Sequence, residues 1–113
     1  MASVYVSNIV INSGSNFSQN FTLESSDTDS SLNLTGYTVD SQMRKYAGSS
    51  AAVDFTTSII SPPTSGEISI SLTSAQTANI KPGRYVYDIL IEKDAIKTKV
   101  IEGMVLVREG VTR

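Results

Sequence analysis

Apolar and polar residues alternate at every second position through much of this chain, and this period constrains the fold more than any other feature. The clearest case is residues 67–72, where Ile68, Ile70 and Leu72 share one face and glutamate and serines occupy the other. Successive side chains of a β-strand point to opposite faces, so the pattern is typical of a half-buried strand. No run of apolar residues at helical spacing extends beyond one turn. The chain is therefore predicted to be all-β.

The same alternation places further strands along the chain, each ended by residues that favour turns. The predicted strands cover residues 4–11, 17–23, 36–44, 53–59, 67–72, 84–92 and 96–108. Thr73 and Gln76 have the spacing of a capping box, which predicts one helical turn before a corner at Lys81-Pro82-Gly83. In the last strand Val100 and Ile101 break the alternation, which predicts a β-bulge.

Seven short strands separated by turn signals indicate an all-β fold, an immunoglobulin-like antiparallel β-sandwich of about seven strands. A small closed barrel is the main alternative. A chain of 113 residues is the size of one domain, so residues 1–113 are predicted to form a single β-sandwich domain. Tyr85, directly after the corner, is the candidate for a tyrosine corner, in which the hydroxyl bonds to upstream backbone. The predicted core includes Val39, Phe55, Ile68, Ile70, Leu72, Tyr85, Tyr87 and Ile89.

The composition excludes several classes of function. The chain has no histidine, cysteine or tryptophan, which removes Ser-His-Asp and Cys-His catalysis, Cys/His zinc sites and disulfides. A net charge of −2 without a basic cluster argues against nucleic acid as a partner. The longest apolar stretches fall far short of the roughly 20 residues that a membrane helix needs. The N-terminus lacks the basic and apolar regions of a signal peptide. We therefore expect no membrane partner, no export by such a signal and no cofactor.

One acidic loop is a candidate for calcium binding. Asp27 and Asp29, with Glu24 nearby, supply the oxygen ligands that Ca²⁺ prefers. The EF-hand pattern fails, because Leu32 and Thr38 stand where it requires Gly and Glu. The alternative is a solvated loop whose side chains hold local turns.

Carboxylates on the strands are the second candidate group. A pair of them could perform glycoside hydrolysis, but nothing in their spacing requires any two to converge, and the alternative is that they are charges that keep strands from aggregating. Asp88 lies in an otherwise apolar strand, so if it is buried we expect it to pair with Arg44 or Arg84. No residue is assigned a catalytic, cofactor-binding or metal-binding role. The carboxylates concerned are Asp40, Asp54, Asp88, Glu92 and Glu102.

From Leu32 onward the chain carries a succession of short motifs made of turn and core residues. They are Leu34-Thr35-Gly36-Tyr37-Thr38, Gln42-Met43-Arg44-Lys45, Gly66-Glu67-Ile68-Ser69-Ile70-Ser71-Leu72, Gln76-Thr77-Ala78, Pro82-Gly83-Arg84-Tyr85-Val86-Tyr87-Asp88, and Glu102-Gly103 with the terminal Val111-Thr112-Arg113. This succession resembles small immunoglobulin-like virion proteins of tailed bacteriophages. It is similar to the amino-terminal sandwich of phage baseplate upper proteins.

The resemblance implies a non-enzymatic structural protein of the virion, in the tail, baseplate, neck or capsid surface. Such a protein acts by contact with other virion proteins and with copies of itself, and the family offers no catalytic residues to carry over. The alternative function is a binding module for carbohydrate or a host surface. An enzyme is the third hypothesis.

Two sequence patterns bear on contacts between copies. Apolar residues occupy both faces of the first predicted strand, which a one-sided strand does not need, so part of it is expected to meet a neighbour. Residues 1–43 carry four acidic and no basic side chains, and residues 81–113 carry seven basic and five acidic ones. If the two ends expose different faces, this asymmetry favours head-to-tail contacts. The apolar residues of the first strand are Val4, Val6, Ile9, Val10 and Ile11.

Overall fold

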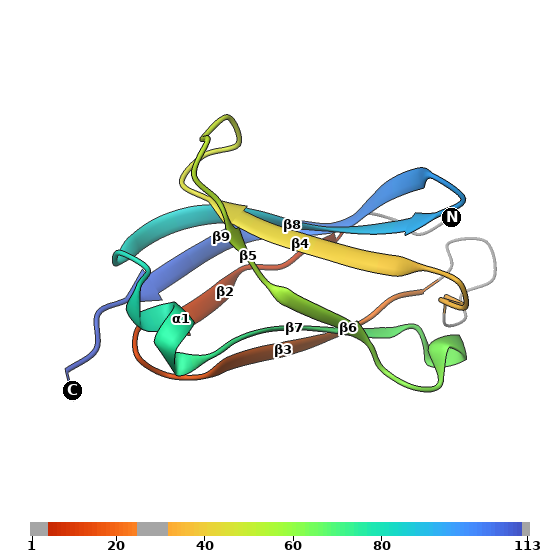
Figure 1. Ribbon diagram of the computed structural model, residues 1–113, viewed down its shortest axis with the longest axis horizontal. Helices are drawn as coiled ribbons and strands as arrows, with labels where there is room; N and C mark the ends of the chain where they lie inside the picture. Colours follow the sequence, from red (N-terminus) through yellow and green to blue (C-terminus); the bar gives the residue numbers. More distant parts are fainter. Residues whose placement is uncertain (1–4, 25–31, 112–113) are drawn as a thin grey trace.

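The computed structural model describes residues 5–24 and 32–111, which form two packed β-sheets (Figure 1). Sheet A contains β1 (Tyr5–Val6), β2 (Ile9–Asn12), β4 (Thr38–Arg44), β5 (Val53–Asp54), β8 (Gly83–Lys93) and β9 (Ile96–Arg108). Sheet B contains β3 (Phe17–Thr22), β6 (Thr56–Ile59) and β7 (Glu67–Leu72). Two short helical turns complete the described elements, η1 (Pro63–Ser65) and α1 (Ser74–Ala78).

The strand order is that of an immunoglobulin-like sandwich. In sheet A the order is β1-β9-β8-β4-β5, with β2 also on β9, and in sheet B it is β3-β7-β6. All described pairs are antiparallel except β1 and β2, which run parallel to β9. Since β1 and β2 keep one register on β9, and only Phe55 separates β5 from β6, the nine described segments make seven strands. The predicted all-β sandwich is confirmed.

The core lies between the two sheets. Seven of the eight predicted core residues are buried, and the eighth, Tyr85, is half-buried and packs against the core. Phe55 lies near its centre, with its ring centroid 6.0 Å from that of Phe17 and 6.3 Å from that of Tyr87. Aromatic pairs at such separations add to the stability gained from buried area alone.

Phe55 also marks a change of sheet that the sequence did not predict. The alternation over residues 53–59 predicts one strand, but β5 pairs with β4 in sheet A and β6 pairs with β7 in sheet B. The Phe55 N–H still donates to the Ser41 carbonyl at 3.0 Å, and the Thr57 hydroxyl reaches the Val39 carbonyl at 2.7 Å. The strand therefore crosses from one layer to the other while its buried ring stays between them.

The predicted bulge in the last strand is confirmed. Ile89 lies opposite Ile101 and Leu90 lies opposite Lys99, so Val100 is the additional residue on β9. Both Val100 and Ile101 are buried. A bulge turns two successive side chains toward one face, which explains why the alternation breaks at this point.

The corner between β7 and β8 follows the sequence closely. Thr73 and Gln76 form the predicted capping box at the start of α1. The buried Thr77 hydroxyl donates to the Ser15 carbonyl at 2.8 Å, which ties α1 to the turn between β2 and β3. The Tyr85 hydroxyl donates to the Lys81 carbonyl at 2.6 Å, as expected of a tyrosine corner. The prediction for Tyr85 is confirmed.

Replacing Tyr85 with phenylalanine removes this hydrogen bond and little else. Because the bond is exposed, water can satisfy the Lys81 carbonyl in the mutant. We expect a loss of unfolding free energy of about 0.5–1.5 kcal/mol, measured by urea denaturation. Tyr46→Phe is the matched control, since Tyr46 is 63% exposed. If Tyr85→Phe and the parent unfold at the same urea concentration, the corner bond contributes nothing to stability.

Candidate functional site on the outer face of sheet A

Four exposed apolar side chains lie together on the outer face of sheet A, and we call them the outer cluster. Val10 lies opposite Leu106 across β2 and β9, and Val86 lies opposite Met104 across β8 and β9. Met104 and Leu106 are two positions apart on one strand, so they share a face. The exposed fractions are 50% for Val10, 37% for Val86, 48% for Met104 and 42% for Leu106. Directly opposed side chains on a sheet are in contact range, so the cluster is continuous.

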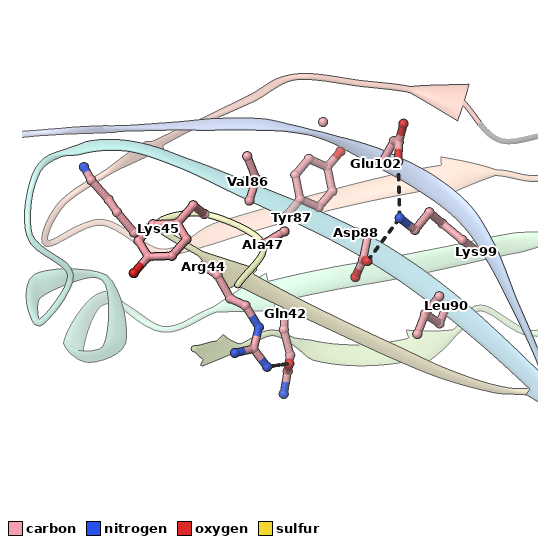
Figure 2. Close-up of a pocket in the computed structure, with 12 residues that line it drawn as sticks. Gln42, Arg44, Lys45, Ala47, Val86, Tyr87, Asp88, Leu90, Lys99 and Glu102 are labelled. Atoms are coloured by element: carbon pink, nitrogen blue, oxygen red, sulfur yellow. Dashed lines mark hydrogen bonds and ion pairs between the residues drawn. The ribbon is translucent and has the colours of Figure 1, made fainter. Parts of the chain in front are cut away.

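An open hollow of about 630 Å³ borders the outer cluster, and Val86 belongs to both. Figure 2 shows side chains from β4, β8 and β9 around this hollow, together with the start of the loop after β4. The Arg44 guanidinium donates to the Ser49 carbonyl and, at 3.0 Å, to Gln42 Oε1. Gln42 in turn donates to Asp54 Oδ1 at 2.6 Å. The bond to Ser49 holds the loop of residues 45–52 against the strands, and the start of this loop forms one wall of the hollow.

Lys99 pairs with two carboxylates on another side of the hollow (Figure 2). Its Nζ lies 3.6 Å from Asp88 Oδ2 and 3.3 Å from Glu102 Oε1. The expected pairing of Asp88 with Arg44 or Arg84 depends on burial of the Asp88 carboxylate. The Asp88 side chain is 40% exposed, so its premise of a buried carboxylate fails. The bulge at Val100 sets Lys99 opposite Leu90, on the same face as Asp88 and Glu102.

The remaining strand carboxylates also lie on sheet A. Asp40, Asp54 and Asp88 line a second hollow of about 480 Å³ together with Lys97. Glu92 lies opposite Thr38 and Lys97, near the end of β8. Three of the five candidates thus share one hollow, which their spacing in the sequence did not reveal. Among the described residues, no group of three or more acidic side chains could hold a metal ion. The calcium candidates Asp27 and Asp29 lie outside the described residues, and Glu24 is exposed.

Beneath the first hollow, Tyr87 binds the N-terminal strand to sheet A. Its hydroxyl donates to the Ser7 carbonyl at 2.6 Å, at the break between β1 and β2. Gly103 permits this approach, because a Cβ there would lie 2.1 Å from the Ser7 oxygen. Burial raises the pKa of the Tyr87 hydroxyl.

The structure explains part of the apolar pattern of the first predicted strand. Ile9 and Ile11 of β2 are buried in the core, whereas Val6 and Val10 are exposed. Val4 lies outside the described residues. Of the four acidic side chains in residues 1–43, those of Asp27 and Asp29 lie outside the described residues. Head-to-tail contacts driven by the charge asymmetry therefore stay a prediction.

The fold defines the chain as a β-sandwich with an immunoglobulin-like strand order, and a comparison with solved structures found a similar fold. The chain is similar to InlP of Listeria monocytogenes, with a TM-score of 0.52 and 12% sequence identity. The similarity covers 95% of this chain and 28% of that chain, and at this identity it concerns the fold alone. No protein-family model matches the chain, and no curated protein matches it. No helix in the described part of the chain is long and apolar enough to cross a membrane.

The raised pKa of Tyr87 predicts a pH-dependent contribution to stability. The native state holds the hydroxyl proton more tightly than the unfolded state, whose tyrosine pKa is about 10. The stabilisation of the folded state by the Tyr87 hydroxyl is therefore complete below that pH, and it is lost as the pH rises through the higher native pKa.

Tyr87→Phe should thus be less stable than the parent by about 1 kcal/mol near neutral pH. The difference in unfolding free energy between parent and mutant should narrow above about pH 10, measured by denaturant unfolding across an alkaline pH series. A gap that stays constant through the alkaline range would contradict this interpretation.

Proposed function

We propose that this chain is a non-enzymatic structural protein of a tailed-phage virion, and that it acts by protein contacts through the outer face of sheet A. The observation that carries the contact role is the outer cluster. The virion assignment is supported by the resemblance of the sequence motifs to phage sandwich proteins. Its place within the tail, baseplate, neck or capsid surface is left open by that resemblance.

The outer cluster has the make-up of a protein interface. Single exposed apolar residues are ordinary on a protein surface, but a continuous group of them is characteristic of a contact site. The neighbouring hollow supplies charged and polar groups, among them Arg44, Lys99 and Glu102. An apolar centre beside a polar rim is the usual anatomy of a specific interface. The expected occupant is a different virion protein, because the rim carries charges of both signs and needs a matching partner.

Binding to the structural proteins encoded by neighbouring genes tests this proposal. We expect one of them to bind the purified chain, measured by titration calorimetry. Met104→Lys places a charge at the centre of the cluster and should weaken that binding about tenfold or more, a loss of about 1.4 kcal/mol.

Ile96→Lys is the matched control. Ile96 is 68% exposed, and its replacement by lysine adds the same charge in the β8–β9 hairpin, away from the cluster. The proposal fails if none of these proteins binds, or if the two lysine variants bind equally well. Absence of the chain from purified particles would overturn the virion assignment alone.

A binding module for carbohydrate or a host surface is the second candidate. Tyr46 lines the hollow and is 63% exposed, beside hydrogen-bonding groups on Gln42 and Asp88. An exposed aromatic face with polar neighbours suits a sugar ring, whose C–H face can pack on the aromatic ring while its hydroxyls hydrogen-bond. On a glycan array, this function predicts a signal that Tyr46→Ala abolishes. If neither the parent nor the variant binds any glycan on the array, this second function is excluded.

A further inference from the structure

Strand β3 has a free edge. It pairs with β7 on one side, and no other described strand pairs with it. In Figure 1 it runs along the lower border of the molecule, below β7. The N-terminal strand, which could have covered this edge, pairs with β9 in the other sheet. Four of the six residues of β3 are exposed along this edge, namely Ser18, Gln19, Asn20 and Thr22.

The hydrogen-bond pattern shows which backbone groups lie on the free edge. The Leu23 N–H donates to the Gly66 carbonyl at 2.8 Å, so residues of odd number in β3 face β7. In an antiparallel pair successive residues alternate between the two sides. The N–H and C=O groups of Ser18, Asn20 and Thr22 therefore point away from sheet B. The side chain of Gln19 donates to the Asn20 carbonyl at 3.4 Å, which agrees with this assignment.

The edge lacks the features that usually prevent strands from pairing between molecules. Phe17–Thr22 contains no charged residue, no proline and no glycine, and its register on β7 is unbroken. Natural sheets protect open edges with charges, prolines, bulges or short strands. The opposite edge of sheet B is protected in this way, because β6 has four residues and the consecutive prolines Pro62 and Pro63 follow it.

We propose that β3 pairs antiparallel with β3 of a second copy of this chain, about a two-fold axis that passes beside Asn20. In this register Asn20 lies opposite the partner's Asn20, and Ser18 lies opposite the partner's Thr22. Every outward-facing backbone group of β3 then meets a partner, and the two sheets B join into one. The inference goes beyond the proposed function, because it concerns the isolated chain and does not depend on the virion assignment.

The side chains of β3 favour a second copy as the occupant. On the outer face, small polar side chains lie opposite each other across the axis, asparagine with asparagine and serine with threonine, and no like charges are opposed. On the inner face Phe17 and Phe21 are only half-buried within one chain. In the dimer the aliphatic part of Gln19 lies opposite Phe21 of the partner subunit and covers it. An isologous contact of this kind closes at two copies.

Charge at the two-fold axis gives a selective test. Asn20→Lys puts two like charges directly opposite each other in the dimer and leaves the monomer unaffected, because Asn20 is exposed. We expect a dimer of the parent chain in sedimentation experiments, and a dissociation constant at least about tenfold higher for Asn20→Lys. Mixing Asn20→Lys with Asn20→Asp should restore the dimer, because the opposed charges then attract.

Ser58→Lys is the matched control. Ser58 and Asn20 both lie opposite Ser69, so the control adds the same charge to the same row of sheet B at its other edge. It should dimerise like the parent. If Ser58→Lys weakens the dimer as much as Asn20→Lys does, the pairing does not occur through β3.

Hydrogen exchange distinguishes this dimer from association through the outer cluster. The amides of Ser18, Asn20 and Thr22 should exchange rapidly in dilute solution and become protected as the dimer forms. The amides of Gln19 and Phe21 should be protected at every concentration, since they bond to β7. A chain that stays monomeric at high concentration overturns the proposal. A dimer whose three even-numbered amides exchange freely also overturns it.

Discussion

The N-terminal strand lies beside β9, where the hydrogen bond from the Tyr87 hydroxyl to the Ser7 carbonyl helps to hold it, and much of the structure follows from that position. The bond forms only because Gly103 leaves room for the Ser7 carbonyl above β9. With Ser7 held there, β1 and β2 extend sheet A beside β9. Val10 then joins Leu106 on the outer face, and β3 is left at the edge of sheet B. Both candidate surfaces thus depend on the pairing of the N-terminal strand with β9.

Most strand positions could be predicted from the sequence, because alternation, turns and caps are local signals. The bulge at Val100, the capping box at Thr73 and the Tyr85 corner all lie where their residue types place them. The sheet change at Phe55 could not be predicted. An alternating run is the same whether its strand stays in one sheet or crosses to the other. The partner of Asp88 was missed for a related reason, since it depends on a register shift in the neighbouring strand.

The candidate site could be predicted only in fragments. The sequence shows apolar residues on both faces of the first strand and Val86 on the reverse face of β8, but it does not show that they meet. They meet because β2 and β8 lie on either side of β9, in a register that opposes Val10 to Leu106 and Val86 to Met104. Strand pairing across the whole length of the chain is not encoded in any local pattern. Exposed fractions, which distinguish Val10 from its buried neighbours Ile9 and Ile11, are likewise available only from the fold.

The two proposed surfaces lie on different layers of the sandwich, so they need not compete. The outer cluster belongs to the outer face of sheet A, and the free edge of β3 belongs to sheet B. Pairing through β3 buries backbone groups at the edge of sheet B. In each of the two copies it leaves the outer face of sheet A open. Because a two-fold contact is isologous, the outer clusters of the two copies are then related by the same axis. A partner that contacts one of them meets an equivalent site on the other copy, so the dimer offers bivalent attachment from a single kind of interface.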